Sequence, residues 1–389
     1  MIKNINIPKH WQVKILGEVC EIKSGKNQSK VINPNGKYPI YGSSGIFGYA
    51  DEYICSEGTT IIGRKGTINS PIYVKTKFWN VDTAFGLCSK EGLNGKFLYY
   101  FCRGFNFHKL DKSTTIPSLS KRDLLSIDIP IPPLNEQLAI VSRIEELLSD
   151  LENGKQQLQT AQQQLEIYRQ SLLKWAFEGK LTNKKIIDNE LPKGWKVVEL
   201  KTVTSILGDG LHGTPKYSDN GEYYFINGNN LCDGKIILKT ETRRVSSEEY
   251  EKYKKPLNDN TILVSINGTL GNIAFYNNEK VILGKSACFF NVLRDIDKNY
   301  VRLLLTGQQF QNYTHNNATG STIKNVSLKS MREFRFPLPS FEEQGQIVQK
   351  LESKLTVCDK IEETISQSLH QVETLKQSIL KKAFEGKLG

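Results

Sequence analysis

The feature that most constrains the fold is an internal duplication. Residues 129–137 (IPIPPLNEQ) match residues 336–344 (FPLPSFEEQ), and residues 170–181 (QSLLKWAFEGKL) match residues 377–388 (QSILKKAFEGKL). Both matches have an offset of 207 residues, so no net insertion separates them. Near the start of each half a Trp motif also repeats, because Trp11 aligns with Trp195 at an offset of 184. Each half is therefore a variable block followed by a constant block.

The matches predict four segments along the chain. Residues 1–130 form a first variable domain and residues 131–181 a central helical spacer. Residues 182–337 form a second variable domain and residues 338–389 a C-terminal helical spacer. The chain has 389 residues, which is long enough for several domains that each bury a core.

Each constant block predicts one long helix, because apolar residues recur at every seventh position. Prolines before each block and a Gly-Lys pair after it predict where the helix begins and ends. The resulting helices span roughly 44 residues, or ~66 Å. One such helix cannot bury its apolar seam alone, so the two copies predict an antiparallel coiled coil. The predicted seam consists of Ile144, Leu151, Leu158, Leu165, Leu172, Leu351, Cys358, Ile365, Val372 and Ile379.

Two features of these helices leave alternatives open. Gly154 falls in the middle of the first helix, where it costs about 1 kcal/mol relative to Ala and allows a local break. Trp175, Phe177 and Phe384 lie outside the seam near the helix ends. The helices therefore either only hold the two halves together or also dock a partner.

The variable blocks predict small α+β domains with a curved sheet and long loops. Short apolar runs between Gly, Asn and Ser residues are typical of strands, and longer amphipathic runs favour helices. The expected strands are 59–63, 71–74, 223–226, 261–265 and 273–276, and the expected helices are 96–105, 248–254 and 300–310.

The positive charge is concentrated in the variable blocks. The net charge is +11, from 52 Lys and Arg against 41 Asp and Glu. Residues 1–128 carry a net +8 and residues 182–334 a net +5, whereas residues 129–181 carry −2 and residues 335–389 carry zero. Two basic blocks indicate two surfaces that face anions, with nucleic acid the first candidate. A solubilising surface is the other interpretation.

Loops of both variable blocks supply side chains suited to nucleic acid. Lys, Arg, Ser and Thr bind phosphates, while Arg, Asn and Gln form paired hydrogen bonds with base edges. For any single loop residue, solvation explains its polarity equally well, so the prediction rests on the clustering. The predicted DNA-binding residues are Lys26, Ser43, Ser44, Arg64, Lys65, Thr67, Asn69, Thr114, Thr115, His212, Thr214, Lys216, Tyr217, Asn227, Asn229, Arg243, Arg244, Asn267 and Lys324.

Catalytic and metal-binding motifs are hard to find in this sequence. Residues 208–213 match G-x-G-x-x-G, but Pro215 and a polar loop follow where a dinucleotide site needs a helix. The seven cysteines form no Cys-x-x-Cys pair and the five histidines have no metal-ligand spacing. No motif of a base methyltransferase or nuclease is complete. We therefore expect no catalytic residue and no metal site.

The order of motifs resembles a known family. Trp11 and Trp195 each open a variable block, and each helical repeat carries Pro-(Leu/Pro)-x-x-Glu-Gln and Ala-Phe-x-Gly-Lys-Leu. This layout is similar to the DNA-specificity subunit of type I restriction–modification systems, over essentially the whole chain. The first Trp motif differs only in having His10 where the second has Gly194.

The resemblance implies a function and partners. Each variable domain would be a target-recognition domain for one half of a split double-stranded DNA site, and the helices would fix the spacing and bind two methyltransferase subunits. Restriction subunits are further partners that the resemblance allows. S-adenosylmethionine, and ATP with Mg, would be bound only by the partner subunits, with no cofactor in this non-catalytic chain.

The duplication adds expectations about symmetry and the target. Two similar halves joined by an antiparallel helix pair predict pseudo-two-fold symmetry. Because the two variable blocks differ, the DNA target should be asymmetric and bipartite. A coiled-coil scaffold for proteins and a solitary modification enzyme are the competing hypotheses. No apolar run approaches the ~18 residues of a membrane span, so we expect a cytoplasmic protein without a membrane partner.

Overall fold

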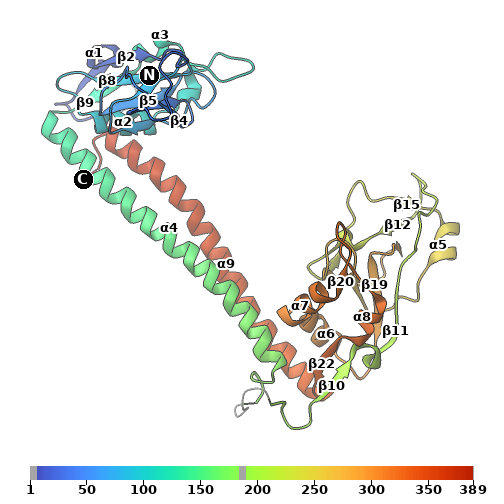
Figure 1. The fold of residues 1–389 in the computed structure, drawn as a ribbon. Coiled ribbons are helices and arrows are strands. Elements are labelled where there is room, and N and C mark those ends of the chain that lie inside the picture. The colour runs from blue at the N-terminus through green and yellow to red at the C-terminus, as the bar shows by residue number, and fades with distance from the viewer. Residues whose placement is uncertain (1–6, 184–189, 389) are drawn as a thin grey trace. The chain divides into compact units, whose positions relative to one another are not determined.

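The computed structural model describes residues 7–183 and 190–388, which form two compact units (Figure 1). Unit 1 comprises the described residues of Met1–Thr160 and Ile365–Gly389, and unit 2 comprises those of Ala161–Thr364. Each unit contains one mixed α and β domain together with parts of two long helices. We name these domain 1 and domain 2. No helix in the described part of the chain is long and apolar enough to cross a membrane.

Domain 1 is built on two small sheets. One is antiparallel, with the strand order β2-β8-β5-β6, and the other has the order β4-β3-β7. Strand β5 is buried along its whole length because it lies inside the first sheet. The elements are β1 (Gln12–Ile15), α1 (Leu16–Val19), β2 (Cys20–Ser24), β3 (Tyr38–Gly42), β4 (Gly45–Ala50), β5 (Thr59–Gly63), β6 (Ile72–Val74), β7 (Trp79–Asn80), β8 (Ala84–Ser89), α2 (Gly95–Gly104), η1 (Phe107–Leu110), α3 (Lys121–Leu125) and β9 (Asp128–Ile131).

Domain 2 repeats this plan with extra short strands. Its two main sheets have the orders β11-β19-β16-β17 and β15-β12-β18. The elements are β10 (Lys196–Glu199), η2 (Leu200–Val203), β11 (Thr204–Asp209), β12 (Tyr223–Ile226), η3 (Gly228–Asn230), β13 (Leu231–Cys232), β14 (Lys235–Ile236), β15 (Arg244–Val245), α5 (Ser247–Tyr253), β16 (Thr261–Ser265), β17 (Ile273–Phe275), β18 (Val281–Leu283), β19 (Ala287–Val292), α6 (Lys298–Thr306), α7 (Gln308–Asn317), β20 (Ala318–Thr319), β21 (Asn325–Val326), α8 (Leu328–Glu333) and β22 (Arg335–Leu338).

The expected α+β class is confirmed, with two corrections. Each domain divides its main strands between two sheets, where we expected one curved sheet. The helix expected at 300–310 is two helices, because α6 ends at Thr306 and α7 begins at Gln308. Gly307 adopts an extended conformation between them (φ −72°, ψ 154°) and so breaks the helical backbone. The apolar pattern continues through this break because both helices bury residues in domain 2.

A pair of terminal strands closes each domain. In domain 1, β1 pairs with β9 in antiparallel fashion, and Gln12 lies opposite Ile131. In domain 2, β10 pairs with β22, and Lys196 lies opposite Leu338. The last strand then passes directly into a long helix through prolines, which cannot continue the hydrogen-bonding of a sheet. Each domain is thereby fixed to the start of the helix that follows it.

The two long helices are α4 (Leu134–Phe177) and α9 (Phe341–Phe384), with 44 residues each. Within each unit their segments are antiparallel, because partner numbers fall along α9 as they rise along α4. In unit 1, Glu152 contacts Lys376 and Lys155 contacts Glu373. In unit 2, Arg169 contacts Asp359 at 2.6 Å, and the ammonium of Lys350 donates to the carbonyl of Leu181. The helix α4 continues without a break through Gly154.

Both helices end as the Gly-Lys pairs predict. Gly179 and Gly386 have positive φ angles of 79° and 68°, which a residue without Cβ adopts at little cost. The next N–H groups reach back across the last turn, from Lys180 to the carbonyl of Trp175 at 2.8 Å and from Lys387 to that of Lys382 at 2.9 Å. These are the bonds of a Schellman motif.

The predicted seam residues face inward along the helix pair. Leu151, Leu158 and Ile379 are half-buried. The remaining seven are buried: Ile144, Leu165, Leu172, Leu351, Cys358, Ile365 and Val372. The ends of the helices also enter the domain cores, and Ile140 and Leu380 share one apolar cluster with Phe97 of domain 1.

The repeated Glu-Gln pair at the start of each helix holds the preceding domain. The indole N–H of Trp11 donates to Glu136 at 2.9 Å, and that of Trp195 donates to Glu343 at 2.9 Å. The neighbouring Gln137 and Gln344 are almost fully buried. The two repeated motifs, Trp at the domain start and Glu-Gln at the helix start, are therefore partners in one contact.

The Ala-Phe motif at the end of each helix packs on a domain helix. Phe384 lies against Phe97 and Phe101 of α2, with ring centroids 5.0 and 5.4 Å apart. Phe177 lies against Tyr300 of α6 at 5.3 Å. Two of the three aromatic residues outside the seam thus pack inside their own unit, whereas Trp175 stays exposed.

Candidate nucleic-acid interface

The loop after β5 forms one edge of domain 1. Lys65 forms an isolated bridge with Ser118, which belongs to the loop before α3. The N–H of Gly66 donates to the carbonyl of Pro117 at 2.9 Å, and the N–H of Leu119 donates to that of Arg64 at 2.9 Å. These bonds hold two loops side by side at the end of the sheet.

Domain 2 repeats this backbone arrangement after β16. Asn267 forms an isolated bridge with Asn325. The N–H of Gly268 donates to the carbonyl of Lys324 at 2.9 Å, and the N–H of Val326 donates to that of Ile266 at 2.8 Å. We call this shared feature the paired-loop frame, with residues 64–67 and 117–119 in domain 1 and residues 266–269 and 324–326 in domain 2.

The frame brings several predicted DNA-binding residues of domain 1 together. Arg64, Lys65 and Thr67 are exposed on its first loop. The guanidinium of Arg64 lies over the ring of Phe85, 5.8 Å from the centroid. Ser43 lies beside this loop, because a Cβ on Gly63 would meet that of Ser43 at 3.1 Å. This edge therefore combines two cations with hydroxyl groups.

The remaining predictions for domain 1 divide into exposed and structural positions. Lys26, Ser44, Thr114 and Thr115 are exposed on other loops. Asn69 has a structural contact, because its side chain accepts a hydrogen bond from the N–H of Phe107 at 2.7 Å.

The loop that carries Thr114 and Thr115 is anchored by Asp111. The hydroxyl of Ser113 donates to this carboxylate at 2.6 Å, and the N–H of Ser118 donates at 3.0 Å. These hydrogen bonds hold the pKa of Asp111 below its usual value. The carboxylate therefore remains a charged acceptor and anchors the loop throughout the neutral range.

In domain 2, two cations are stacked on aromatic rings. Arg243 lies over Tyr217, 5.6 Å from its centroid, and Arg244 lies over Tyr224 at 4.9 Å. Lys216 is exposed next to Tyr217. Such a cluster presents cations that can bind phosphates, with the aromatic rings holding them in place.

The frame of domain 2 brings other predicted residues together. Asn267 and His212 line a hollow of about 460 Å³ with Lys285 and Asn325. His212 contacts the carboxylate of Asp209 at 2.6 Å. Lys324 is exposed on the second loop of the frame.

The other predictions in domain 2 lie outside this hollow. Thr214 is exposed on the loop after β11, and Asn229 is exposed within the short helix η3. Asn227 has a structural contact, because its side chain and that of Asn230 form a reciprocal capping box around η3. Its side chain also accepts a hydrogen bond from Ser286 at 3.0 Å.

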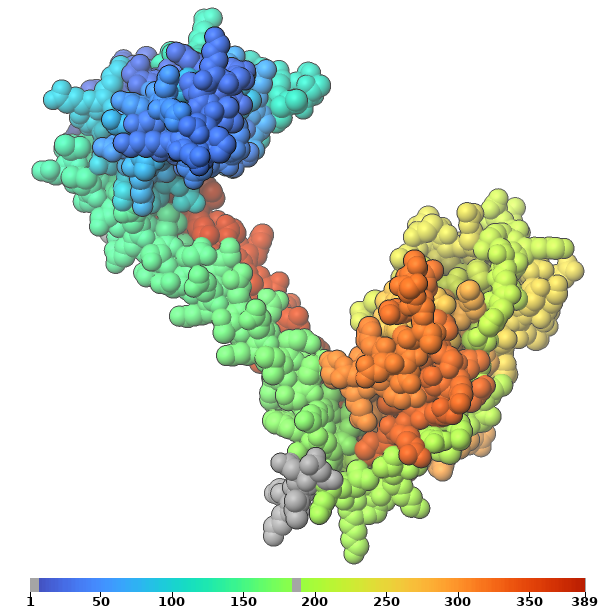
Figure 2. Space-filling view, in the orientation of Figure 1, coloured from blue at the N-terminus to red at the C-terminus, as the bar shows by residue number. Residues whose placement is uncertain are grey.

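Sequence reasoning missed one pair of exposed residues directly beside the frame. Ile116 and Ile323 occupy equivalent positions at an offset of 207, and each is 61% exposed. Ile116 lies in the loop between η1 and α3, and Ile323 lies in the hairpin loop between β20 and β21. Figure 2 shows teal and orange loops that project from the surfaces of the two domains. The internal duplication could have identified this pair, because Thr115-Ile116 matches Thr322-Ile323. A prediction restricted to polar side chains omits them.

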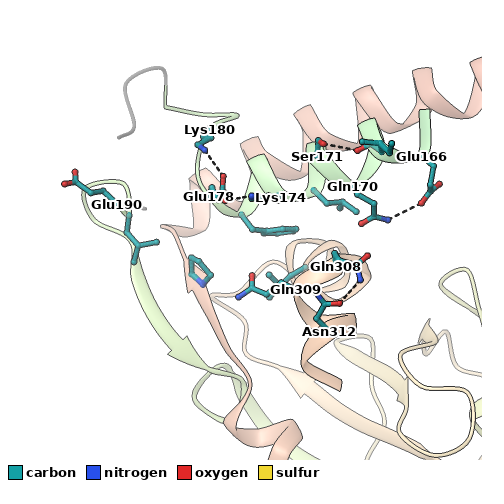
Figure 3. Close-up of a pocket in the computed structure, with 17 residues that line it drawn as sticks. Glu166, Gln170, Ser171, Lys174, Glu178, Lys180, Glu190, Gln308, Gln309 and Asn312 are labelled. Atoms are coloured by element: carbon teal, nitrogen blue, oxygen red, sulfur yellow. Dashed lines mark hydrogen bonds and ion pairs between the residues drawn. The ribbon is translucent and has the colours of Figure 1, made fainter. Parts of the chain in front are cut away.

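Unit 2 has a second hollow, of about 860 Å³, between α4 and domain 2 (Figure 3). Its apolar wall includes Ile167, Phe177 and Leu304. Ile167 is 67% exposed although it lines this hollow. The polar side of the hollow is formed by Glu166, Lys174, Gln308 and their neighbours. A partner could contact apolar side chains here without unfolding the helix pair.

Neither hollow resembles a metal or redox centre. Among the described residues, no group of three or more His, Cys, Asp or Glu side chains could hold a metal ion. All seven cysteines are free thiols. The G-x-G-x-x-G segment lies at the end of β11 and the following loop, as expected from Pro215.

The family model and the known proteins that match this sequence are described as type I restriction specificity proteins. The family model of the type I restriction modification DNA specificity domain matches residues 8–160 and 192–371. The EcoBI specificity subunit of Escherichia coli is 27% identical over 347 residues, which cover 84% of this chain and 73% of that protein. The MjaVIII specificity subunit of Methanocaldococcus jannaschii is 24% identical over 99% of this chain and 94% of its own.

Solved structures show the same fold. The HsdS subunit from Thermoanaerobacter tengcongensis has a TM-score of 0.67 with 20% identity, and the whole of both chains is covered. A chain from a structure on complex assembly and conformational transition of the type I R-M system has a TM-score of 0.74 with 19% identity, covering 98% of this chain and 99% of that one. With two family matches that each contain one recognition domain, this chain belongs to the type I restriction–modification DNA specificity family.

Proposed function

We propose that this chain directs a type I modification complex to an asymmetric, bipartite DNA site, with domain 1 binding one half-site and domain 2 the other. The observation that carries the proposal is the paired-loop frame. It has the same backbone bonds in both domains but presents Lys65 and Ser118 in one and Asn267 and Asn325 in the other. Equal frames with unequal side chains suit two half-sites of different sequence.

The basic side chains around the frames would hold the DNA backbone. Arg64 is exposed at the frame of domain 1, and Arg243 and Arg244 are exposed at the second sheet of domain 2. Contacts with phosphates give affinity and position, whereas contacts with base edges give specificity. Both kinds of group are present in each domain.

The helix pair would dock two methyltransferase subunits. Its outer surface in unit 2 carries exposed Ile167 and Tyr168 on α4 and Val357 and Ile361 on α9. The contact of Arg169 with Asp359 sets the register and places Ile167 level with Ile361. Apolar side chains that a folded unit leaves exposed favour a partner surface over a purely structural pair.

In this proposal the chain itself is non-catalytic and holds no cofactor. S-adenosylmethionine would bind the methyltransferase subunits, and ATP with Mg would bind restriction subunits where the system has them. Binding of S-adenosylmethionine to the isolated chain would instead support the solitary modification enzyme.

The proposal is tested by selecting random duplex DNA on this chain assembled with the methyltransferase of its own system. We expect enrichment of two unlike short sequences at a fixed spacing. If the assembled complex enriches no sequence, a protein scaffold or sequence-independent binding accounts better for the chain.

Replacing Arg64 and Lys65 with Ala should weaken DNA binding and reduce its salt dependence. Loss of the Arg64 phosphate contact lowers the slope of log K against log [salt] by ~1, and loss of the second exposed cation weakens binding further. The control is Lys381→Ala with Lys382→Ala, which removes the same charge from exposed positions on α9. Titrations at several salt concentrations measure both slopes. An unchanged slope for the first variant would remove these residues from the interface.

Replacing Ile167 with Glu should prevent assembly with the methyltransferase while the chain stays folded. The side chain is 67% exposed, so folding does not depend on it, whereas a charge in an apolar contact costs about tenfold or more in affinity. Gln163→Glu, one turn away on the same helix and also exposed, is the control. Equal assembly of both variants in gel filtration would place the docking surface elsewhere.

A further inference from the structure

The residue before a third strand also contacts the paired-loop frame in each domain. This contact shows which residues of the two domains are equivalent. The N–H of Arg64 donates to the carbonyl of Thr83 at 2.7 Å, and the N–H of Ile266 donates to that of Ser286 at 3.0 Å. Thr83 and Ser286 are therefore equivalent. The preceding residues, Asp82 and Lys285, must then be equivalent too.

Residues at equivalent backbone positions consequently differ in the charge and the hydrogen-bonding groups of their side chains. Domain 1 presents the cation Lys65, where domain 2 presents the amide Asn267. Domain 1 presents the exposed carboxylate of Asp82, where domain 2 presents the exposed cation Lys285. A frame that only stabilised the fold would not need its exposed charges to change sign between copies.

The amide pair in domain 2 has hydrogen-bonding groups to spare. The amide nitrogen of Asn267 donates to the carbonyl oxygen of Asn325 at 3.2 Å. Whichever amide donates within the pair, one carbonyl and one NH₂ group keep free capacity. An acceptor and a donor side by side match the N6 amine and N7 acceptor of adenine, which Asn binds in this way.

The surroundings of the pair form a site of suitable size and polarity. The hollow of about 460 Å³ is lined by Asn267, Asn325, His212 and Lys285, with Val326 and Leu328 supplying apolar surface. The carboxylate of Asp209 holds His212 at 2.6 Å. Polar groups that converge in a partly apolar hollow are typical of a specific binding site.

We propose that this hollow is the specificity pocket of domain 2, in which Asn267 and Asn325 together recognise an adenine in the second half-site. The equivalent Lys65 recognises a guanine in the first half-site, because an ammonium group donates to its O6 and N7 acceptors. This inference rests on the proposed function, since it assigns bases to the half-sites.

The test exchanges the frame side chains within the full chain assembled with its methyltransferase. Asn267→Lys with Asn325→Ser transfers the side chains of domain 1 into domain 2. We expect the selected DNA to lose its preference for adenine at one position of the second half-site, by about tenfold or more, and to gain guanine there. The first half-site should be unchanged.

Two further variants serve as controls for this exchange. Asn267→Ala with Asn325→Ala should flatten the same position without creating a new preference, which covers the case in which the exchange variant is poorly folded. Asn316→Lys, at an exposed position of α7, adds the same charge elsewhere in domain 2 and should leave both half-sites unchanged.

The possible outcomes separate this inference from the proposed function. In one outcome the wild-type complex selects a bipartite motif that the Ala variant, equally well assembled, also selects. That result would contradict the specificity pocket and leave the proposed function standing. If the wild-type complex selects no bipartite motif, the proposed function itself fails. A change confined to one position of the second half-site supports the pocket.

Discussion

Replacing both Leu165 and Val372 with Asp is expected to separate the helix pair and to abolish assembly with the methyltransferase. Both side chains are buried in the seam, Leu165 in unit 2 and Val372 in unit 1. Each substitution removes about 1.5–3 kcal/mol of apolar burial and places a carboxylate where it has to be neutralised or hydrated. Against a total stability of about 5–15 kcal/mol for a folded domain, two such changes are large.

Circular dichroism during heating and gel filtration would measure this effect. Gln163→Asp with Gln371→Asp places the same charges at exposed positions of the same two helices, and we expect this control to melt like the wild type. If the variant carrying Leu165→Asp and Val372→Asp were soluble, melted normally and still assembled, it would contradict the coiled-coil account.

How much of this molecule could be predicted depended on how far apart the interacting residues lie in the sequence. The long helices were predictable because a seven-residue repeat is a local pattern, and their ends followed from Gly179 and Gly386. The sheet order was not, because β1 and β9 pair across more than a hundred residues. No local pattern indicates which of the short strands share a sheet.

The same reason limits prediction of the site. Composition indicated that loops bearing Arg64, Lys65 and Asn267 face nucleic acid. It did not indicate that Lys65 lies beside Ser118 or that Asn267 lies beside Asn325, because these bridges join loops more than fifty residues apart. The frame is defined by backbone bonds between distant loops, and these bonds exist only in the folded domains.

The role of the repeated Glu-Gln motif also required the structure. Its position near the start of each helix did not indicate which residues it contacts. In the structure, Glu136 and Glu343 accept hydrogen bonds from Trp11 and Trp195. The motif therefore holds each domain against the helix that follows it, which makes the geometry between the domain and its helix part of the fold.

Gln137 and Gln344 extend this attachment into the domain helices. Gln137 accepts a hydrogen bond from the N–H of Asn94 at 2.8 Å, and Gln344 accepts one from the N–H of Asp297 at 2.8 Å. Asn94 and Asp297 are the N-cap residues of α2 and α6. Each Gln therefore completes a helix cap from another element of the same unit.

Replacing Gln137 with Leu should destabilise unit 1 by about 3 kcal/mol or more. The substitution keeps the apolar volume but leaves the N–H of Asn94 and the carbonyls of Gly92 and Pro132 without their partner. Each unsatisfied buried group costs about 1–3 kcal/mol, and the carbonyl of Gly92 contributes least because this residue is exposed. Gln344→Leu should destabilise unit 2 by less, because it leaves only the N–H of Asp297 and the carbonyl of Pro339 without a hydrogen-bond partner.

Urea denaturation of the full chain would assign each loss to its unit when it is followed by fluorescence in variants whose only tryptophan is Trp11 or Trp195, with Trp79 and Trp175 replaced by Phe in both. Gln156→Leu and Gln349→Leu, at exposed positions of the same helices, should leave both transitions unchanged. If Gln137→Leu were no more destabilising than Gln156→Leu, the three hydrogen bonds would contribute little. The duplicated motif would then need an explanation outside the fold, with a partner subunit the first candidate. A selective loss would instead show that the motif fixes each domain to its helix.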